Sequence, residues 1–169
     1  MRVCGVQMSE PVWKKIREAA PLNAEGLLAG LDLDQSFPVD VEAVAQGMGI
    51  GIERTADDED GCLVIEDGKA TIKISERVAP VRQRFTIAHE LGHLALGHEF
   101  ERTIHRDVSP QRPWKVEREA NAWAAQFLMP EDRVRVVAKA LSSLEEMASY
   151  FNVSTDAMIY RLKDLGIID

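Results

Sequence analysis

An H-E-x-x-H segment, from His89 to His93, constrains this chain more than any other feature, because it lies inside a stretch of strong helical periodicity. Pro80 is suited to the first turn and Gly97 follows the last apolar residue, so the sequence predicts a helix over about 80–97. Residues four apart in a helix lie one above the other, so both imidazoles leave the same face. Two imidazoles at this spacing can bind one Zn²⁺ ion.

Glu90 follows the first histidine on the same wall of the predicted helix. A carboxylate there can take a proton from metal-bound water and pass it to a leaving amine. A catalytic zinc ion also needs a third protein ligand and one open position. In the metzincin pattern a glycine and a histidine follow at fixed steps, but Gly97 and His98 come four and five residues after His93, which does not match. A carboxylate from a second helix is the remaining source.

A second helix, predicted over about 114–128, carries the candidate third ligand. Glu117 and Asn121 are four residues apart and share a face. Glu117 can therefore bind the metal, while the side-chain carbonyl of Asn121 accepts the N–H of a ligand histidine and fixes its tautomer. Glu119 lies about 200° further round the helix. We favour Glu117 over Glu119 as the ligand, and Glu119 remains the alternative.

Several other residues on or near these two helices have a structural interpretation. Gly92 and Ala120 are small, so the two helices are expected to approach closely enough to share one ion. His98 and His105 are the other histidines, and each is a candidate for polarising a scissile carbonyl. A surface or core histidine is the simpler interpretation of both. Three large residues further along the second helix are expected to pack in the core: Trp123, Phe127 and Leu128.

A small sheet is predicted before the histidine helix. Apolar and polar residues alternate around Ile52, Leu63 and Ile72, and Asp67-Gly68 is a signal for a tight hairpin turn. We expect at least three strands, antiparallel across the hairpin. The strand around Thr71 to Ile74 directly precedes the histidine helix, so we expect it to be the edge that receives an extended substrate.

Shorter helices are predicted on both sides of this core. The N-terminal stretch 11–30 reads as helix, and Asp40 is expected to cap a short helix before the sheet. Three further helices are expected over about 131–140, 143–151 and 155–164. Capping boxes occur where the second of these begins, at Ser142 with Glu145 and at Ser143 with Glu146.

The last two predicted helices resemble a helix-turn-helix, the motif that reads DNA with its second helix. Residues 141–169 hold 5 acidic against 2 basic side chains, however, whereas a phosphate-bound helix is normally cationic. The whole chain has a net charge of −8, and residues 81–169 hold 13 acidic against 12 basic side chains. We therefore expect no direct binding to nucleic acid, and interpret this segment as a packing or partner-docking unit.

Composition places the chain in the cytoplasm. No run approaches the ~20 apolar residues that a membrane span needs, so no membrane association is expected. The N-terminal residues lack the apolar segment of a secretory signal. Two isolated cysteines are too few for a disulfide framework or a thiolate zinc site.

Several segments together resemble the ImmA/IrrE family of zinc metallopeptidases: Arg84–His93, Glu117–Asn121 and Ala124–Pro130, with Pro38–Glu42 upstream. The resemblance covers about residues 37–130. It implies a bacterial, phage or mobile-element origin and a zincin-like core with one Zn²⁺ per chain. In the family two histidines and a downstream glutamate bind zinc, and the glutamate after the first histidine is the base.

Carried over to this chain, the resemblance makes His89, His93 and Glu117 the ligands and Glu90 the base. It also implies an endopeptidase that cuts a helix-turn-helix transcriptional repressor and relieves repression in a stress response. The alternative is a non-proteolytic antirepressor or toxin–antitoxin binding module with a structural or sensory metal site. Glu90 favours the enzyme, because a structural zinc ion has no use for a carboxylate beside an open position.

The predicted fold class is α+β. It combines a zincin-like metallopeptidase core, made of a small mainly antiparallel sheet, an H-E-x-x-H helix and a glutamate-bearing helix, with further helices at the C-terminus. Residues 1–130 are expected to form the metallopeptidase domain, in which 1–36 are an N-terminal helical extension. Residues 131–169 are expected to form a helix-turn-helix-like segment packed on that domain.

Overall fold

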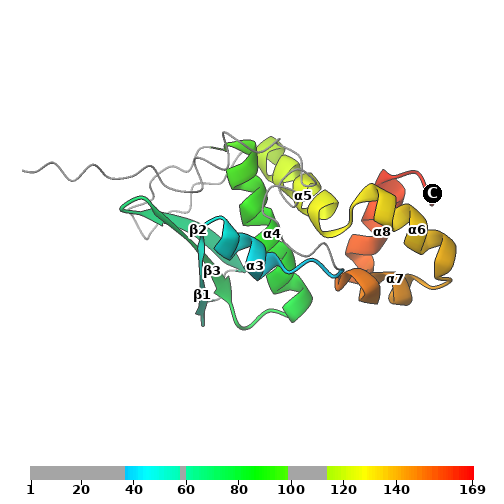
Figure 1. The fold of residues 1–169 in the computed structure, drawn as a ribbon, viewed down its shortest axis with the longest axis horizontal. Helices are drawn as coiled ribbons and strands as arrows, with labels where there is room; N and C mark the ends of the chain where they lie inside the picture. Colours follow the sequence, from blue (N-terminus) through cyan, green and yellow to red (C-terminus); the bar gives the residue numbers. More distant parts are fainter. Residues whose placement is uncertain (1–36, 58–59, 99–113) are drawn as a thin grey trace, which may run out of the picture.

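The computed structural model describes residues 37–57, 60–98 and 114–169 of the chain. The helix expected over 11–30 and the side chain of His105 lie outside the described residues. The α+β class is confirmed, and Figure 1 shows the elements in their spatial arrangement. In chain order they are α3 (Val41–Gly47), β1 (Gly51–Thr55), β2 (Gly61–Glu66), β3 (Lys69–Ser75), α4 (Pro80–Leu96), α5 (Trp114–Leu128), α6 (Glu131–Ala140), α7 (Leu144–Phe151) and α8 (Thr155–Asp164).

The sheet is mixed, with the strand order β1-β3-β2. Strands β2 and β3 form the expected antiparallel hairpin, in which Leu63 lies opposite Ile72. Its turn residues Asp67 and Gly68 have φ angles of 49° and 78°, the left-handed conformation that a tight hairpin turn requires. Strand β1 runs parallel to β3, with Ile52 opposite Ile72. One of the two pairings is thus parallel. The sequence did not predict this, because the alternation of side chains that predicts a strand does not specify the direction of its partner.

The expectation that the strand around Thr71 to Ile74 is the edge of the sheet is wrong. These residues belong to β3, which lies between β1 and β2. The parallel pairing with β1 covers the side of β3 that the hairpin leaves open, and local sequence contains no signal for such a long-range contact. Among the described strands, β1 and β2 are the edges.

Strand β2 approaches helix α4 closely at Gly61. A Cβ atom on this residue would lie 2.6 Å from the carbonyl oxygen of Lys73 and 2.8 Å from Cγ2 of Thr86 on α4. Distances this short exclude any larger side chain unless the helix or strand shifts. The glycine therefore allows the β2 edge to lie directly against the histidine helix.

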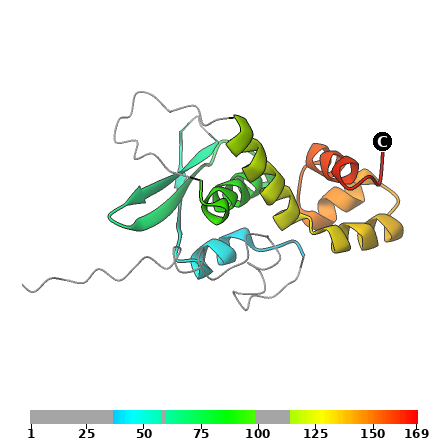
Figure 2. The ribbon, with the colours of Figure 1, turned by 90° about the horizontal axis from the view of Figure 1, so that it is seen from above.

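Helices α4 and α5 occupy the middle of the molecule, with the sheet on one side and helices α6–α8 at the opposite end (Figures 1 and 2). A Cβ atom on Gly92 would lie 3.1 Å from the carbonyl oxygen of Ala120 and 3.1 Å from Cε3 of Trp123. The close approach expected from these small residues is confirmed. The predicted packing role of Trp123 and Phe127 is confirmed as well, since both are buried and their rings stack with centroids 5.0 Å apart.

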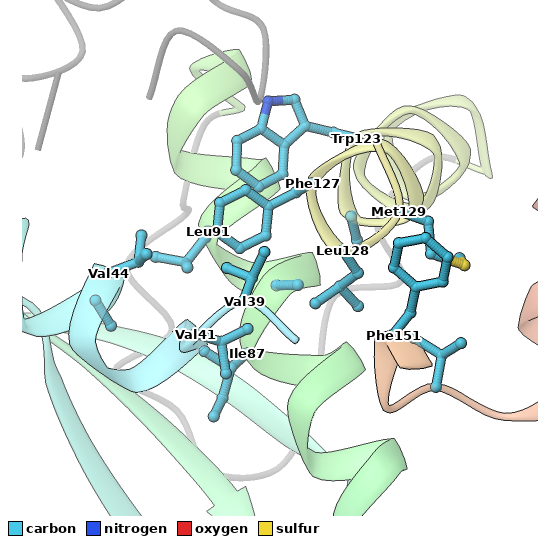
Figure 3. Close-up of a cluster of buried hydrophobic side chains, with 14 of the residues drawn as sticks. Val39, Val41, Val44, Ile87, Leu91, Trp123, Phe127, Leu128, Met129 and Phe151 are labelled. Atoms are coloured by element: carbon cyan, nitrogen blue, oxygen red, sulfur yellow. The ribbon is translucent and has the colours of Figure 1, made fainter. Parts of the chain in front are cut away.

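One hydrophobic cluster connects these parts. Figure 3 shows side chains of α3, α4, α5 and α7 gathered in it, with Leu91 and Phe127 among them. Both of these side chains are fully buried. Burying a large apolar side chain contributes roughly 1.5–3 kcal/mol, so each such residue stabilises the packing of the helix that carries it.

Local capping signals define most of the helix ends. The Asp40 carboxylate accepts hydrogen bonds from the backbone N–H groups of Glu42 and Ala43, at 3.1 and 3.0 Å, as predicted for α3. Ser143 rather than Ser142 caps α7, accepting from the N–H of Glu146 at 3.1 Å. Such caps contribute about 1 kcal/mol each.

Buried and partly buried polar contacts attach the C-terminal helices to the rest of the chain. Arg161 of α8 is 4% exposed, and its Nε donates to the carbonyl oxygen of Met129 at 3.0 Å. Arg84 of α4 donates to the carbonyl oxygens of Val39, at 2.9 Å, and Asn152, at 3.3 Å. Burial lowers the pKa of the Arg84 guanidinium below its ordinary value, and the carboxylate of Asp40 opposes this shift.

No helix within the described residues is long and apolar enough to cross a membrane.

Candidate metal centre

Helix α4 brings two imidazoles to its contact with α5. The side chain of His93 is fully buried and that of His89 is 14% exposed. Their Nε2 atoms lie only 2.9 Å apart, and the two rings meet edge to face. As predicted from their i, i+4 spacing, the Nε2 atoms of His89 and His93 lie close together on one face of α4.

Glu117 of α5 reaches the same point from the facing helix. Its carboxylate oxygens lie 3.1 Å from Nε2 of His89 and 3.5 Å from Nε2 of His93. Around a tetrahedral zinc ion with bonds of about 2.0–2.1 Å, ligand atoms are separated by roughly 3.3 Å. The observed distances lie on either side of that value. Within the described residues, the three side chains form a group able to hold a metal ion, and two imidazoles with one carboxylate are a donor set that suits zinc.

Asn121 lies one helical turn after Glu117, at the position where the sequence placed it. Its Oδ1 atom is 2.9 Å from Nδ1 of His89. An amide oxygen only accepts hydrogen bonds, so Nδ1 donates in this contact, and a neutral imidazole then keeps its lone pair on Nε2. The structure thus brings Glu117 and Asn121 of α5 to His89 of α4, as predicted from the sequence. Their roles in metal binding remain a proposal.

The far nitrogen of His93 has a partner that sequence reasoning did not assign. Nδ1 of His93 lies 2.8 Å from Nδ1 of His98, whose Nε2 is 3.3 Å from Oε2 of Glu119. His98 is not part of the group that could hold the ion, and Glu119 contacts His98 rather than His89 or His93 in the contacts described. The one local signal for this contact is Gly97, which ends α4 with a φ of 71° and turns the chain back.

Glu90 is 4% exposed and lies on α4 directly after His89. Glutamate side chains are seldom buried to this extent, and buried carboxylates occur often at functional sites. The position agrees with the base predicted from the sequence, although its role is likewise a proposal.

A family model described as the IrrE N-terminal-like domain of the M78 peptidases matches residues 45–163. The radiation response metalloprotease IrrE of Deinococcus radiodurans is 35% identical over 103 residues, which are 55% of this chain and 30% of that protein. The metallopeptidase ImmA of Bacillus subtilis is 28% identical over 109 residues, covering 61% of this chain and 63% of that protein. The chain thus spans less than two thirds of the length of either relative. These matches confirm the resemblance found in the sequence.

A solved structure shares the fold. A transcriptional regulator of Mycobacterium tuberculosis superposes with a TM-score of 0.62 at 16% sequence identity, covering 91% of this chain and 51% of the other. At this identity the likeness concerns the arrangement of elements alone.

Proposed function

The chain belongs to the peptidase family defined by the IrrE N-terminal-like domain, and from this membership we propose that it is a zinc-dependent endopeptidase that cleaves a regulatory protein. The family resemblance favours a helix-turn-helix transcriptional repressor as the substrate, cut in the cytoplasm so that repression ends. The observation that carries the proposal is the convergence of His89, His93 and Glu117, whose ligand atoms have the spacing of a tetrahedral zinc site.

Zinc bound at this point would polarise the scissile carbonyl and make a water molecule acidic enough to attack at neutral pH. Glu90 accepts the proton of the attacking water and delivers it to the nitrogen of the leaving amine. Glu90 is 4% exposed, so bulk water has little access to its carboxylate. The two histidines and Glu117 hold the site, while Asn121 holds the ring of His89 in place.

Strand β2 is the proposed docking edge for an extended substrate. It pairs with β3 on one side only among the described strands, and Gly61 lets it lie against α4. A substrate segment added to this edge would form backbone hydrogen bonds that fix its register beside the metal centre. Hydrogen exchange with a bound substrate should slow at amides of β2, and protection confined to β1 would contradict this assignment.

We propose that the chain has two functional parts, residues 1–130 and residues 131–169. The first part holds the metal centre, and the second forms a helix-turn-helix-like unit that packs on it through contacts such as Arg161 with Met129. The acidic character of the second part makes it a candidate for contacts with protein rather than DNA.

Two measurements test the proposal. Elemental analysis should find about one zinc per chain in the wild type and in Glu119→Ala, and none in Glu117→Ala. Incubation with a panel of purified helix-turn-helix repressors should then produce a defined cut with the wild type. Glu90→Gln should lose at least ~10²-fold in cleavage rate while keeping its zinc.

Each contrary result has a definite meaning. Cleavage by Glu90→Gln at the wild-type rate would exclude the mechanism. A folded chain that binds zinc, binds a repressor and does not cut it would instead identify a non-proteolytic antirepressor. Zinc lost with Glu119→Ala rather than Glu117→Ala would reassign the third ligand.

A further inference from the structure

We propose that His98 and Glu119 act as a pair of positioning residues that fix the tautomer of His93 and direct its Nε2 atom at the metal. The inference rests on the proposed zinc site, to which it adds two residues that sequence reasoning left without a role there. Its support is a continuous line of two contacts, from Glu119 of α5 to His98 just after α4, and from His98 to the buried imidazole of His93.

The turn at the end of α4 places His98. Gly97 adopts a left-handed conformation with a φ of 71°, and the backbone N–H of His98 donates to the carbonyl oxygen of His93 at 3.0 Å. This bond holds the chain against the last turn of the helix, so the His98 ring lies beside the His93 ring with centroids 5.0 Å apart. The side chain of His98 is only 12% exposed, so its orientation is set by packing rather than by solvent.

With both imidazoles neutral, the hydrogen bonds along this line allow one arrangement of protons. A carboxylate only accepts hydrogen bonds, so Nε2 of His98 donates to Glu119. A neutral imidazole has one N–H, so Nδ1 of His98 is then an acceptor, and Nδ1 of His93 donates to it. The lone pair of His93 is thereby left on Nε2, the atom that faces His89 and Glu117.

The two ligand histidines thus reach the same tautomer by different means. His89 donates directly to Asn121 of α5, while His93 donates to His98, which spans the distance to Glu119 on the same helix. Glu119 lies on a different face of α5 from Glu117, and this line of hydrogen bonds lets it orient His93 through His98. Metal-bound histidines generally need such a partner, and its removal costs 10–100-fold in metal affinity.

Lys115 provides a control position. Its Nζ atom lies 3.8 Å from Oε1 of Glu119, the oxygen that His98 does not contact, and its side chain is 82% exposed. Replacing it changes the charge near Glu119 but leaves the line to His93 intact. An effect that depends on charge alone would appear in Lys115→Ala, while an effect of the hydrogen bond would not.

The first experiment measures zinc affinity by competition with a chromophoric chelator. Glu119→Ala should bind zinc about tenfold more weakly than the wild type, while Lys115→Ala should bind it unchanged. In His98→Gln the amide oxygen can accept from His93 without help from Glu119, so adding Glu119→Ala to this variant should cost nothing further. Equal losses from Glu119→Ala in both backgrounds would overturn the proposal.

The second experiment reads the tautomer in the metal-free protein, and so decides the proposal even if the chain proves not to cleave or to bind zinc. Long-range ¹H–¹⁵N spectra should show His93 protonated at Nδ1 in the wild type and in Lys115→Ala, and a mixture of tautomers in Glu119→Ala. Glu119 is partly exposed, so this variant is expected to fold. An unchanged Nδ1–H signal of His93 in Glu119→Ala would show that the pair does not set the tautomer.

Discussion

The α4–α5 pair and the C-terminal helices α6–α8 differ in what they bury. The buried residues of α4 include the ionisable side chains Glu90 and His93. The buried positions of α7 and α8 are apolar except for Arg161. Burying polar groups costs free energy unless they are satisfied, so the first region depends on polar contacts such as that of His93 with His98, and the second depends chiefly on apolar packing.

The same contrast appears at the helix ends. Helices α7 and α8 begin at Ser143 and Ser154, whose hydroxyl groups each accept a backbone N–H at 3.1 Å. Helix α4 begins at Ala79 without a side-chain cap. Helix α4 has Pro80 at its start and a left-handed Gly97 at its end instead, so a side-chain N-cap distinguishes α7 and α8 from α4.

Natural probes allow the two regions to be followed separately. Trp114 and Trp123 both lie on α5, and both tyrosines of the chain, Tyr150 and Tyr160, lie on α7 and α8. The third tryptophan, Trp13, lies outside the described residues, so tryptophan fluorescence is best measured in a Trp13→Phe background, where it reports on α5. The tyrosine ring NMR signals report on α7 and α8.

The largest expected effect comes from removing Phe151, which is fully buried and meets Phe37 edge to face at 5.7 Å. Phe151→Ala should lower the free energy of unfolding by about 3–5 kcal/mol, because a large cavity remains. Urea denaturation measures this loss. Tyr150 signals should shift in the folded variant, while its zinc affinity stays at the wild-type value. A parallel loss of zinc affinity would show that the two regions are coupled.

Removing the metal should cause the next largest loss of stability, and it should act on the α4–α5 pair. At a free zinc concentration 100 times the dissociation constant, the native state gains about 2.7 kcal/mol. Treatment with a chelator should therefore lower the melting temperature of the wild type as measured by tryptophan fluorescence. Glu117→Ala should melt at the same temperature with and without zinc. A chelator effect that persists in this variant would place the metal elsewhere.

Filling the contact between α4 and α5 comes third. Gly92→Leu should cost about 1–3 kcal/mol, because its side chain meets Ala120 and Trp123 at once. Zinc affinity should fall with it, since the helices that share the ion are pushed apart. Gly166→Ala is the matched control, at a φ of 63° with open space around it. It should cost about 1–2 kcal/mol through backbone strain and leave zinc binding unchanged.

The smallest effect is expected from the caps. Ser143→Ala and Ser154→Ala should each cost about 1 kcal/mol, by leaving one backbone N–H without its hydroxyl partner. The two losses should add, because they belong to separate helices. Thermal unfolding followed by circular dichroism gives both values. Loss of zinc affinity in either variant would show that these caps act beyond their own helices.

The helices could be predicted because each has its signals within a few residues of its ends. Pro80 and Gly97 delimit α4 as expected, and Asp40 caps α3. The hairpin was also predictable, from Asp67-Gly68. The place of β3 in the centre of the sheet was not, because its pairing with β1 joins segments about twenty residues apart.

The metal centre divides in the same way. The sequence alone determined that His89 and His93 share a helical face and that Glu117 and Asn121 share another, since side-chain directions within one helix follow from its period. Only the tertiary structure decided that these faces meet, and that His98 and Glu119 join them. Distances between helices depend on packing, here on the absence of a side chain at Gly92 where Trp123 approaches. A helical period fixes where a side chain points, and packing fixes what it meets.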